Sequence, residues 1–287
     1  MAVFEMIKYH NQIYPSNIPL RIEECSANFD VKSVESTLDL SLHTEYSYGK
    51  RKMDSNIVLQ YPNILNAQKN EVPQLWKDEN WACEFAHFLF DIADNRTPKI
   101  IEIHPPFTDY SDFNIFIKNY RVFENIILDK YPNVEILIEN RCGSVYNGGK
   151  FLISKNQDIY ELCDNIEKSD LKLKIAYDIP QIYTANNVKS SEQYLELLED
   201  ITNYRTFIGG VHLWGKRKSQ TGRRVAHCGD LNSYFENDIQ LKKEFLICFN
   251  SVFSDGIVRK MVLEVNSGNE DLVSIVNDLL NTGIEFI

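Results

Sequence analysis

The amino-acid sequence predicts an α/β protein: a single (β/α)8 TIM barrel, a parallel eight-stranded barrel with outer helices, in one domain over residues 1–287. Short apolar runs alternate with longer amphipathic segments, which is typical of repeated βα units and a parallel sheet. Eight such apolar runs can be counted, and a length of 287 residues matches one closed barrel. No glycine-rich phosphate loop follows the first run, so a dinucleotide-binding sheet is disfavoured.

The predicted strands are clearest from residue 99 onward, and the N-terminal third is harder to interpret. In chain order, the eight predicted strands cover residues 3–10, 37–43, 56–62, 99–106, 134–140, 173–180, 207–214 and 260–267. Apolar residues recur near helical spacing between the later strands, and several of these segments open on Ser, Asp or Asn. The predicted helices cover residues 74–95, 111–131, 156–169, 190–204, 236–253 and 269–283.

Composition is that of a soluble globular protein, with 44% hydrophobic and 25% charged residues. The six cysteines are scattered and form no CxxC pair, so a disulfide framework or zinc knuckle is not expected. The sequence shows neither a signal peptide nor an apolar stretch of membrane-spanning length, so we expect a cytoplasmic protein with no membrane partner. The net charge of −11 disfavours a protein that coats nucleic acid non-specifically.

One local basic run stands against this acidic background. It follows Trp214 and consists of Lys216, Arg217, Lys218, Arg223 and Arg224. A solvated loop is the plain interpretation of such a run, and a grip on a substrate phosphate is the alternative. Trp214 either stacks on a ring of the substrate or only closes the loop.

Acid, base and metal-capable residues stand at the ends of five consecutive predicted strands: His104, Glu139, Asp178, His212 and Glu264. The carboxyl ends of barrel strands converge on one mouth, where paired carboxylates need a counter-ion. Strand parity places a smaller apolar residue two positions before each of the last four, on the same face. Two Glu, one Asp and one His form a mixed nitrogen and oxygen set that suits a divalent metal ion such as Zn, Mn or Mg.

These residues, in the segments "LIEN", "AYDIP", "GVHLW" and "VLEVN", resemble the metal pattern of the xylose isomerase-like TIM barrels. That superfamily includes sugar isomerases, 3-epimerases and the endonuclease IV family of abasic-site endonucleases (AP endonuclease family 2). The resemblance implies that Glu139, Asp178, His212 and Glu264 bind metal. In the epimerases, the two metal-bound glutamates also exchange a proton with the sugar, which gives Glu139 and Glu264 catalytic roles here.

The endonuclease branch uses three zinc ions and further ligands. His104 and His227 match two of its histidines. Gln60 and Gln181 stand where that pattern has histidines, and Val225 stands where it has an aspartate. An amide is a poor zinc ligand compared with imidazole, so the three-zinc set is incomplete. Asp230 is a candidate carboxylate behind an imidazole.

Three functions therefore remain open. The first is a single-metal isomerase or epimerase that acts on a small sugar, polyol or sugar phosphate. The alternative is an endonuclease IV-like phosphodiesterase with an incomplete zinc site, for which nucleic acid is the partner. The third is a non-catalytic barrel with a vestigial site. The intact four-ligand set and the acidic charge favour the first.

Overall fold

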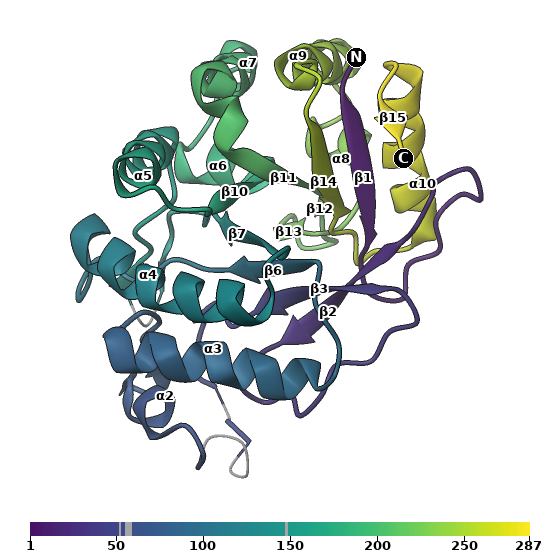
Figure 1. Ribbon diagram of the computed structural model, residues 1–287. Coiled ribbons are helices and arrows are strands. Elements are labelled where there is room, and N and C mark those ends of the chain that lie inside the picture. The colour runs from purple at the N-terminus through teal and green to yellow at the C-terminus, as the bar shows by residue number, and fades with distance from the viewer. Residues whose placement is uncertain (52, 55–58, 147–148) are drawn as a thin grey trace.

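A computed structural model describes residues 1–287 except 52, 55–58 and 147–148. Its centre is a closed barrel of eight parallel strands ringed by helices, which confirms the predicted TIM barrel (Figure 1). The barrel strands are β1 (Val3–Lys8), β2 (Ile22–Ala27), β3 (Asp39–Thr44), β6 (Ile100–Ile103), β7 (Glu135–Glu139), β10 (Lys174–Asp178), β11 (Ile208–Leu213) and β14 (Val258–Leu263).

Pairing of the first and last barrel strands closes the cylinder. Strand β14 pairs with β11 on one side and with β1 on the other, with Met6 opposite Met261. The short strand β15 (Glu285–Phe286) extends the sheet by pairing with the beginning of β1. All barrel pairings are parallel, so the carboxyl ends of the strands meet at one mouth.

Helices follow the later strands, as the sequence predicts. They are α2 (Pro62–Asn66), α3 (Glu79–Ala93), α4 (Phe113–Lys130), α5 (Asn156–Ser169), α6 (Ile179–Ala185), α7 (Ser191–Asp200), the 3-10 helix η1 (Ile201–Phe207), α8 (Leu231–Tyr234), α9 (Ile239–Phe253) and α10 (Asn269–Asn281). Aspartate side chains begin several of them: Asp78, Asp112 and Asp238 each accept a hydrogen bond from a backbone N–H in the first turn. Among the described residues, no helix is long and apolar enough to cross a bilayer.

Three two-stranded hairpins rise from the loops on the mouth side. They are β4 (Gln68–Lys69) with β5 (Val72–Pro73), β8 (Val145–Tyr146) with β9 (Gly149–Lys150), and β12 (Lys216–Lys218) with β13 (Arg224–Ala226). The basic run of the sequence therefore forms a hairpin rather than an irregular loop.

The N-terminal third corrects one predicted strand. Residues 59–62 of the predicted strand 56–62 form a turn and the first residue of α2, and residues 56–58 lie outside the described residues. The barrel strand that was missed is β2, whose sequence IEECSA has no clear apolar alternation. Residues 9–21 and 28–38, on either side of β2, contain no helix, so strands and helices do not alternate in this part of the chain.

Inside the barrel, an apolar layer supports a polar one. Ile22, Ile100, Leu137, Ala176 and Val262 form part of a buried cluster on the inner faces of five strands. Two residues further along each of these strands stands a carboxylate, as the period of two requires. Glycines on β11 make room: a Cβ at Gly209 or Gly210 would come within 2.7 or 3.0 Å of the Leu137 side chain. The space beside Gly210, the predicted small residue below His212, is therefore filled by the Leu137 side chain.

Candidate metal centre at the barrel mouth

Histidine and carboxylate side chains meet at the mouth, and six of them lie at or near the ends of six different barrel strands. The residues are His43 on β3, His104 just after β6, Glu139 at the end of β7, Asp178 at the end of β10, His212 on β11 and Glu264 just after β14. Five of them are the residues that the sequence singles out, and all five are buried. His43 is the sixth, with a side chain that is 16% exposed.

Two imidazoles and one carboxylate form the first ligand group. The Nε2 atoms of His43 and His104 lie 3.1 Å apart, and the His104 Nε2 lies 2.7 Å from Oε2 of Glu139. The His43 Nε2 lies 3.9 Å from the same oxygen. With Glu102, these side chains offer ligand atoms that all lie close enough together to hold one metal ion. The indole of Trp76 donates a hydrogen bond to the His104 carbonyl at 2.7 Å and fixes the backbone there.

Glu139, Asp178 and His212 form the second group that could hold a metal ion. The Gln181 amide donates hydrogen bonds to Glu139 Oε1 and to Asp178 Oδ2. The indole of Trp214 donates to the same Asp178 oxygen at 3.0 Å. These neutral donors hold the two carboxylates in place without adding charge.

Glu139 belongs to both groups, and its two oxygens have different neighbours. Its Oε2 faces His104, and Arg141 donates to that oxygen at 3.0 Å. Its Oε1 faces Gln181 and the Asp178 side. One carboxylate thus spans the two positions at which a cation could sit.

Glu264 completes the far side of the mouth. Its carboxylate lies 3.2 Å from Nδ1 of His212 and 3.2 Å from Nδ1 of His227. The His227 ring stacks on Trp214 with centroids 4.3 Å apart. His227 therefore reaches the same carboxylate as His212 but from the β12–β13 side.

Charges at the mouth push the pKa values of these groups apart. Burial opposes the charged form of His43, but Glu24, Glu102 and Glu139 raise its pKa to about 10. Burial lowers the pKa of His104 to about 4, which leaves its ring neutral. Burial, with Glu139 and Glu264, raises the pKa of Asp178 to about 7. Such opposed shifts are typical of functional sites.

The donor set fits a divalent cation. Among the described residues, His212 Nδ1, His104 Nδ1 and Glu102 Oε1 are buried atoms without a hydrogen-bond partner at this mouth. Five largely buried carboxylates gather there, namely Glu24, Glu102, Glu139, Asp178 and Glu264. Buried charges of one sign need a counter-ion, and imidazole with carboxylate suits Zn or Mn better than Mg.

A cavity of about 520 Å³ opens over these ligands. Its wall includes Tyr9, Tyr46, Arg141, Trp214 and Lys216. The sequence did not point to Tyr9 or Tyr46, and it left open whether Arg141, two residues after Glu139, contacts a sugar or a phosphate. His43 was not predicted either, although it ends the predicted strand 37–43 as the other polar residues end theirs.

Gln60 and Asp230 lie apart from this cavity. Gln60 is on the exposed turn before α2, so the strand-three position of the barrel belongs to His43 instead. Asp230 begins α8, where it accepts from the Ser233 N–H at 2.9 Å and from the Ser274 hydroxyl at 2.8 Å. Its carboxylate supports a helix and not an imidazole.

Most of the basic hairpin has acidic partners. Arg217 pairs with Asp271 at 2.6 Å, and both Lys218 and Arg224 pair with Glu236. Arg223 is exposed, and of the five basic residues Lys216 lines the cavity. The hairpin is therefore less positive than its sequence suggests.

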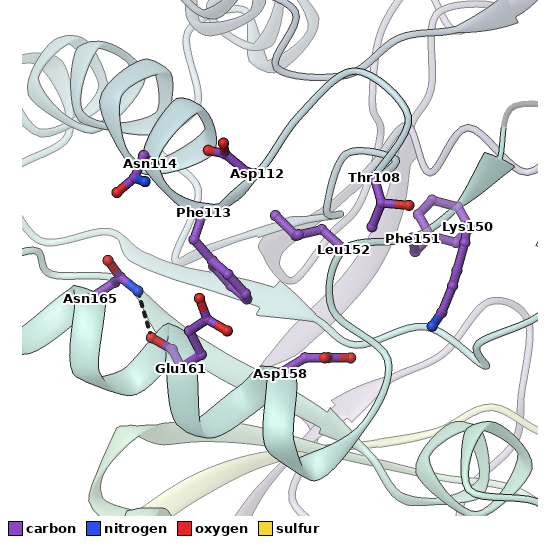
Figure 2. Close-up of a pocket in the computed structure, with 10 residues that line it drawn as sticks. All are labelled: Thr108, Asp112, Phe113, Asn114, Lys150, Phe151, Leu152, Asp158, Glu161 and Asn165. Atoms are coloured by element: carbon purple, nitrogen blue, oxygen red, sulfur yellow. Dashed lines mark hydrogen bonds between the residues drawn. The ribbon is translucent and has the colours of Figure 1, made fainter.

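A second cavity, of about 350 Å³, lies outside the barrel between the beginnings of α4 and α5 (Figure 2). The Phe113 ring on α4 points toward Glu161 on α5. No group of described residues that could hold a metal ion lies there. The barrel mouth is the candidate site.

Comparisons with known proteins concern the fold. No protein-family model and no curated protein matches the chain. It is similar to a D-tagatose 3-epimerase-like protein, with a TM-score of 0.49, 15% identity and coverage of 97% of both chains. It is also similar to AsfvAP:AG, with a TM-score of 0.49, 12% identity and coverage of 91% of this chain and 97% of that one. A third similar structure is the 3-keto-D-glucoside 4-epimerase from E. coli, with a TM-score of 0.47, 12% identity and coverage of 98% of this chain and 99% of that one.

These structural neighbours are xylose isomerase-like TIM barrels, sugar epimerases among them, all at low sequence identity. The chemistry of the mouth follows from its own residues.

Proposed function

We propose that the chain is a divalent-metal-dependent enzyme that hydrolyses a phosphate ester at the barrel mouth. The observation that carries this proposal is the position of Glu139, whose two oxygens face two separate ligand groups. A carboxylate shared between two metal positions is typical of two-metal hydrolytic centres. The cations of such centres supply Lewis-acid polarisation of substrate oxygens and lower the pKa of water.

The chain's own residues would bind and orient the phosphate. Arg141 and Lys216 are cationic side chains in the wall of the cavity, and Arg141 is held beside Glu139. A guanidinium matches two phosphate oxygens with two parallel N–H donors. Trp214 offers an apolar wall for the organic part of the substrate and shields Asp178 from water.

A single-metal isomerase or epimerase is the second candidate. It is favoured by the convergence of Glu139, Asp178, His212 and Glu264, which needs no help from His43 or His104. That mechanism asks Glu139 and Glu264 to accept and return a proton. Burial opposes their charged forms, but Arg141 and the adjoining imidazoles lower the pKa of Glu139, and His212 and His227 lower the pKa of Glu264. Hydrolysis at two cation positions is preferred because it also uses His43 and His104, which the single-metal mechanism leaves without a role.

A non-catalytic barrel and a nucleic-acid substrate have less support. A vestigial site would not be expected to keep six converging ligand residues. A nucleic-acid groove needs unpaired basic side chains, whereas Arg217, Lys218 and Arg224 have acidic partners. A small phosphate ester therefore fits better than a polynucleotide.

The experiment compares His43→Asn with the control His87→Asn. His87 is a surface histidine on α3, far from the mouth. Apo protein would be loaded with Zn²⁺ or Mn²⁺ and assayed on bis(p-nitrophenyl) phosphate, p-nitrophenyl phosphate and a panel of ketoses. We expect phosphate ester hydrolysis by the unmodified chain and the control, and loss by His43→Asn of at least about 100-fold.

Ketose isomerisation that survives His43→Asn would favour the second candidate. Absence of bound divalent metal in the unmodified chain would remove both enzymatic candidates and leave the non-catalytic barrel.

A further inference from the structure

Two buried glutamates stand behind the ligand groups without being needed as ligands. Glu24 on β2 is 7% exposed and Glu102 on β6 is 2% exposed. They lie on the inner face, two residues after Ile22 and Ile100, one layer nearer the mouth than the apolar floor. Neither belongs to the four-residue set that the sequence resemblance implies.

Glu24 contacts the ring nitrogen of His43 that faces away from the first ligand group. The His43 Nδ1 lies 3.1 Å from Glu24 Oε1, whereas its Nε2 faces His104 and Glu139. An imidazole that donates its Nδ1–H to a carboxylate keeps the Nε2 lone pair for a cation. In the neutral ring that binding a cation requires, this geometry therefore selects the Nδ1–H tautomer of His43.

Glu102 holds His212 in the opposite sense. Its Oε2 lies 2.9 Å from the His212 Nε2, and the His212 Nδ1 faces Glu264 at 3.2 Å. The buried Nδ1 lies beside the Glu264 carboxylate without the alignment of a hydrogen bond. Here the Nε2–H is donated to the carboxylate and the Nδ1 lone pair is left for a cation.

We propose that Glu24 and Glu102 are positioning residues that fix His43 and His212 in opposite tautomers, so that each presents a lone pair to its own cation position. This inference rests on the proposed two-cation centre and deepens it. Glu102 also lies 3.7 Å from the His43 Nδ1 through its other oxygen, so it adjoins both imidazoles from below. His104 has no such carboxylate behind its Nδ1 among the described residues and depends on ring stacking with His43, at a centroid distance of 4.9 Å.

The competing interpretation makes these glutamates ligands themselves. Glu24, His43 and Glu264 form a group that could hold a metal ion, and Glu102 joins the first group. If Glu24 were a ligand there, Nδ1 of His43, the nitrogen nearer Glu24, would have to bind the cation. The Nε2 atom of His43 would then no longer serve as a ligand in the first group, with His104. The two arrangements differ in which nitrogen binds and in how many cations are held.

The test titrates the apo protein with Co²⁺ and follows visible absorption and stoichiometry in Glu24→Leu, Glu24→Gln, Glu102→Leu and Glu102→Gln. The matched control is Glu23→Gln, on the same strand as Glu24 but paired with Lys8 and Ser36 on the other face. We expect two cations per unmodified chain. Each Leu variant should bind one of them about 10- to 100-fold more weakly, as expected for loss of a partner behind a metal ligand. Each Gln variant should recover most of the affinity, because its amide oxygen still accepts the N–H bond.

Nitrogen NMR of the Zn²⁺-loaded unmodified chain gives a readout that needs no variant. We expect an Nδ1–H tautomer for His43 and an Nε2–H tautomer for His212. The reverse tautomer at either residue, or unchanged Co²⁺ affinity in folded Leu variants, would overturn the inference. Loss of one whole cation in a Gln variant would overturn it in favour of a ligand role. An unmodified chain that binds no divalent cation would overturn the two-cation centre as well.

Discussion

The two ends of the barrel bury charge in opposite ways. At the amino end of β14, the Arg259 side chain is 1% exposed, yet its guanidinium donates to both oxygens of Asp255, at 2.8 and 2.7 Å, and to the carbonyls of Arg205 and Ile208. At the mouth, buried atoms of Glu102, His104 and His212 lack such partners, and the carboxylates outnumber the fixed cations.

The difference separates a structural ion pair from a functional cluster. A buried pair is tolerable when every donor and acceptor is matched, as around Arg259. A cluster with unmatched buried atoms costs stability, and such a cost is retained where activity requires it.

Asp255→Ala should remove the carboxylate partner of Arg259 at the amino end of β14. It leaves the Arg259 guanidinium buried without its carboxylate, which should lower the free energy of unfolding by about 3–5 kcal/mol. Urea denaturation followed by circular dichroism measures this loss. Divalent metal affinity at the mouth should not change. Asp271→Ala, which removes the exposed pair with Arg217, is the control and should cost less than about 1 kcal/mol. Equal losses in the two variants would contradict the contrast.

Metal should supply what the mouth lacks. At a free Zn²⁺ concentration about 1,000-fold above the dissociation constant, each site should add about 4 kcal/mol to the free energy of unfolding. Thermal unfolding with and without a chelator would show this as a higher melting temperature for the loaded protein. A melting temperature indifferent to chelator would mean that the unmatched atoms at the mouth do not bind a cation.

Glu139→Gln should weaken both cation positions at once, because one carboxylate faces both groups. We expect a loss of more than about 100-fold in affinity at each, or about 2.7 kcal/mol. Competition with a chromophoric chelator measures it. Asp178→Asn is the comparison variant, and it should affect the second position more than the first. A Glu139→Gln variant that loses one cation and binds the other normally would show that the carboxylate does not bridge.

Lowering the pH should weaken the ion pair of Asp255 with Arg259 and so lower the free energy of unfolding. Hydrogen bonds from Arg259 lower the pKa of Asp255 from 3.8 to about 2. A carboxyl whose pKa is lower in the folded than in the unfolded chain adds stability above the unfolded pKa, and that stability is lost as pH falls through the folded pKa. The Asp255 contribution, about 2 kcal/mol, should therefore fade between pH 4 and pH 2. Unfolding of Asp255→Asn across that range should show a flatter pH dependence than unfolding of the unmodified chain.

The polar residues that end successive strands could be predicted from the sequence. Side chains alternate along a strand with a period of two, and the strand ends of a parallel barrel meet at one mouth. Glu139, Asp178, His212 and Glu264 were found in this way, and the structure brings them to one mouth. The later strands and helices were predicted for the same reason, since their apolar periodicity is strong.

The rest depended on tertiary context. Glu24 lies in a strand without alternating apolar and polar residues, and the connections before and after that strand contain no helix. Neither apolar periodicity nor an alternation of strands and helices therefore predicts it. His43 ends the predicted strand 37–43, which is the third barrel strand and not the second, because β2 was not predicted. The ligand position of the third strand was therefore expected at Gln60. The pairing of Arg217, Lys218 and Arg224 with acids of α10 and of the turn after α8 is likewise invisible in one dimension.

Trp214 makes the mouth observable by light. The chain has three tryptophans. Trp76 and Trp81 lie 5.2 Å apart, packed among the phenylalanines between the barrel and its outer helices. Trp214 instead bonds to the Asp178 carboxylate and stacks on His227, so its ring contacts candidate ligand side chains directly. A paramagnetic ion at the mouth should quench its emission, and the difference between the unmodified chain and Trp214→Phe would let occupancy be followed in real time without any added dye.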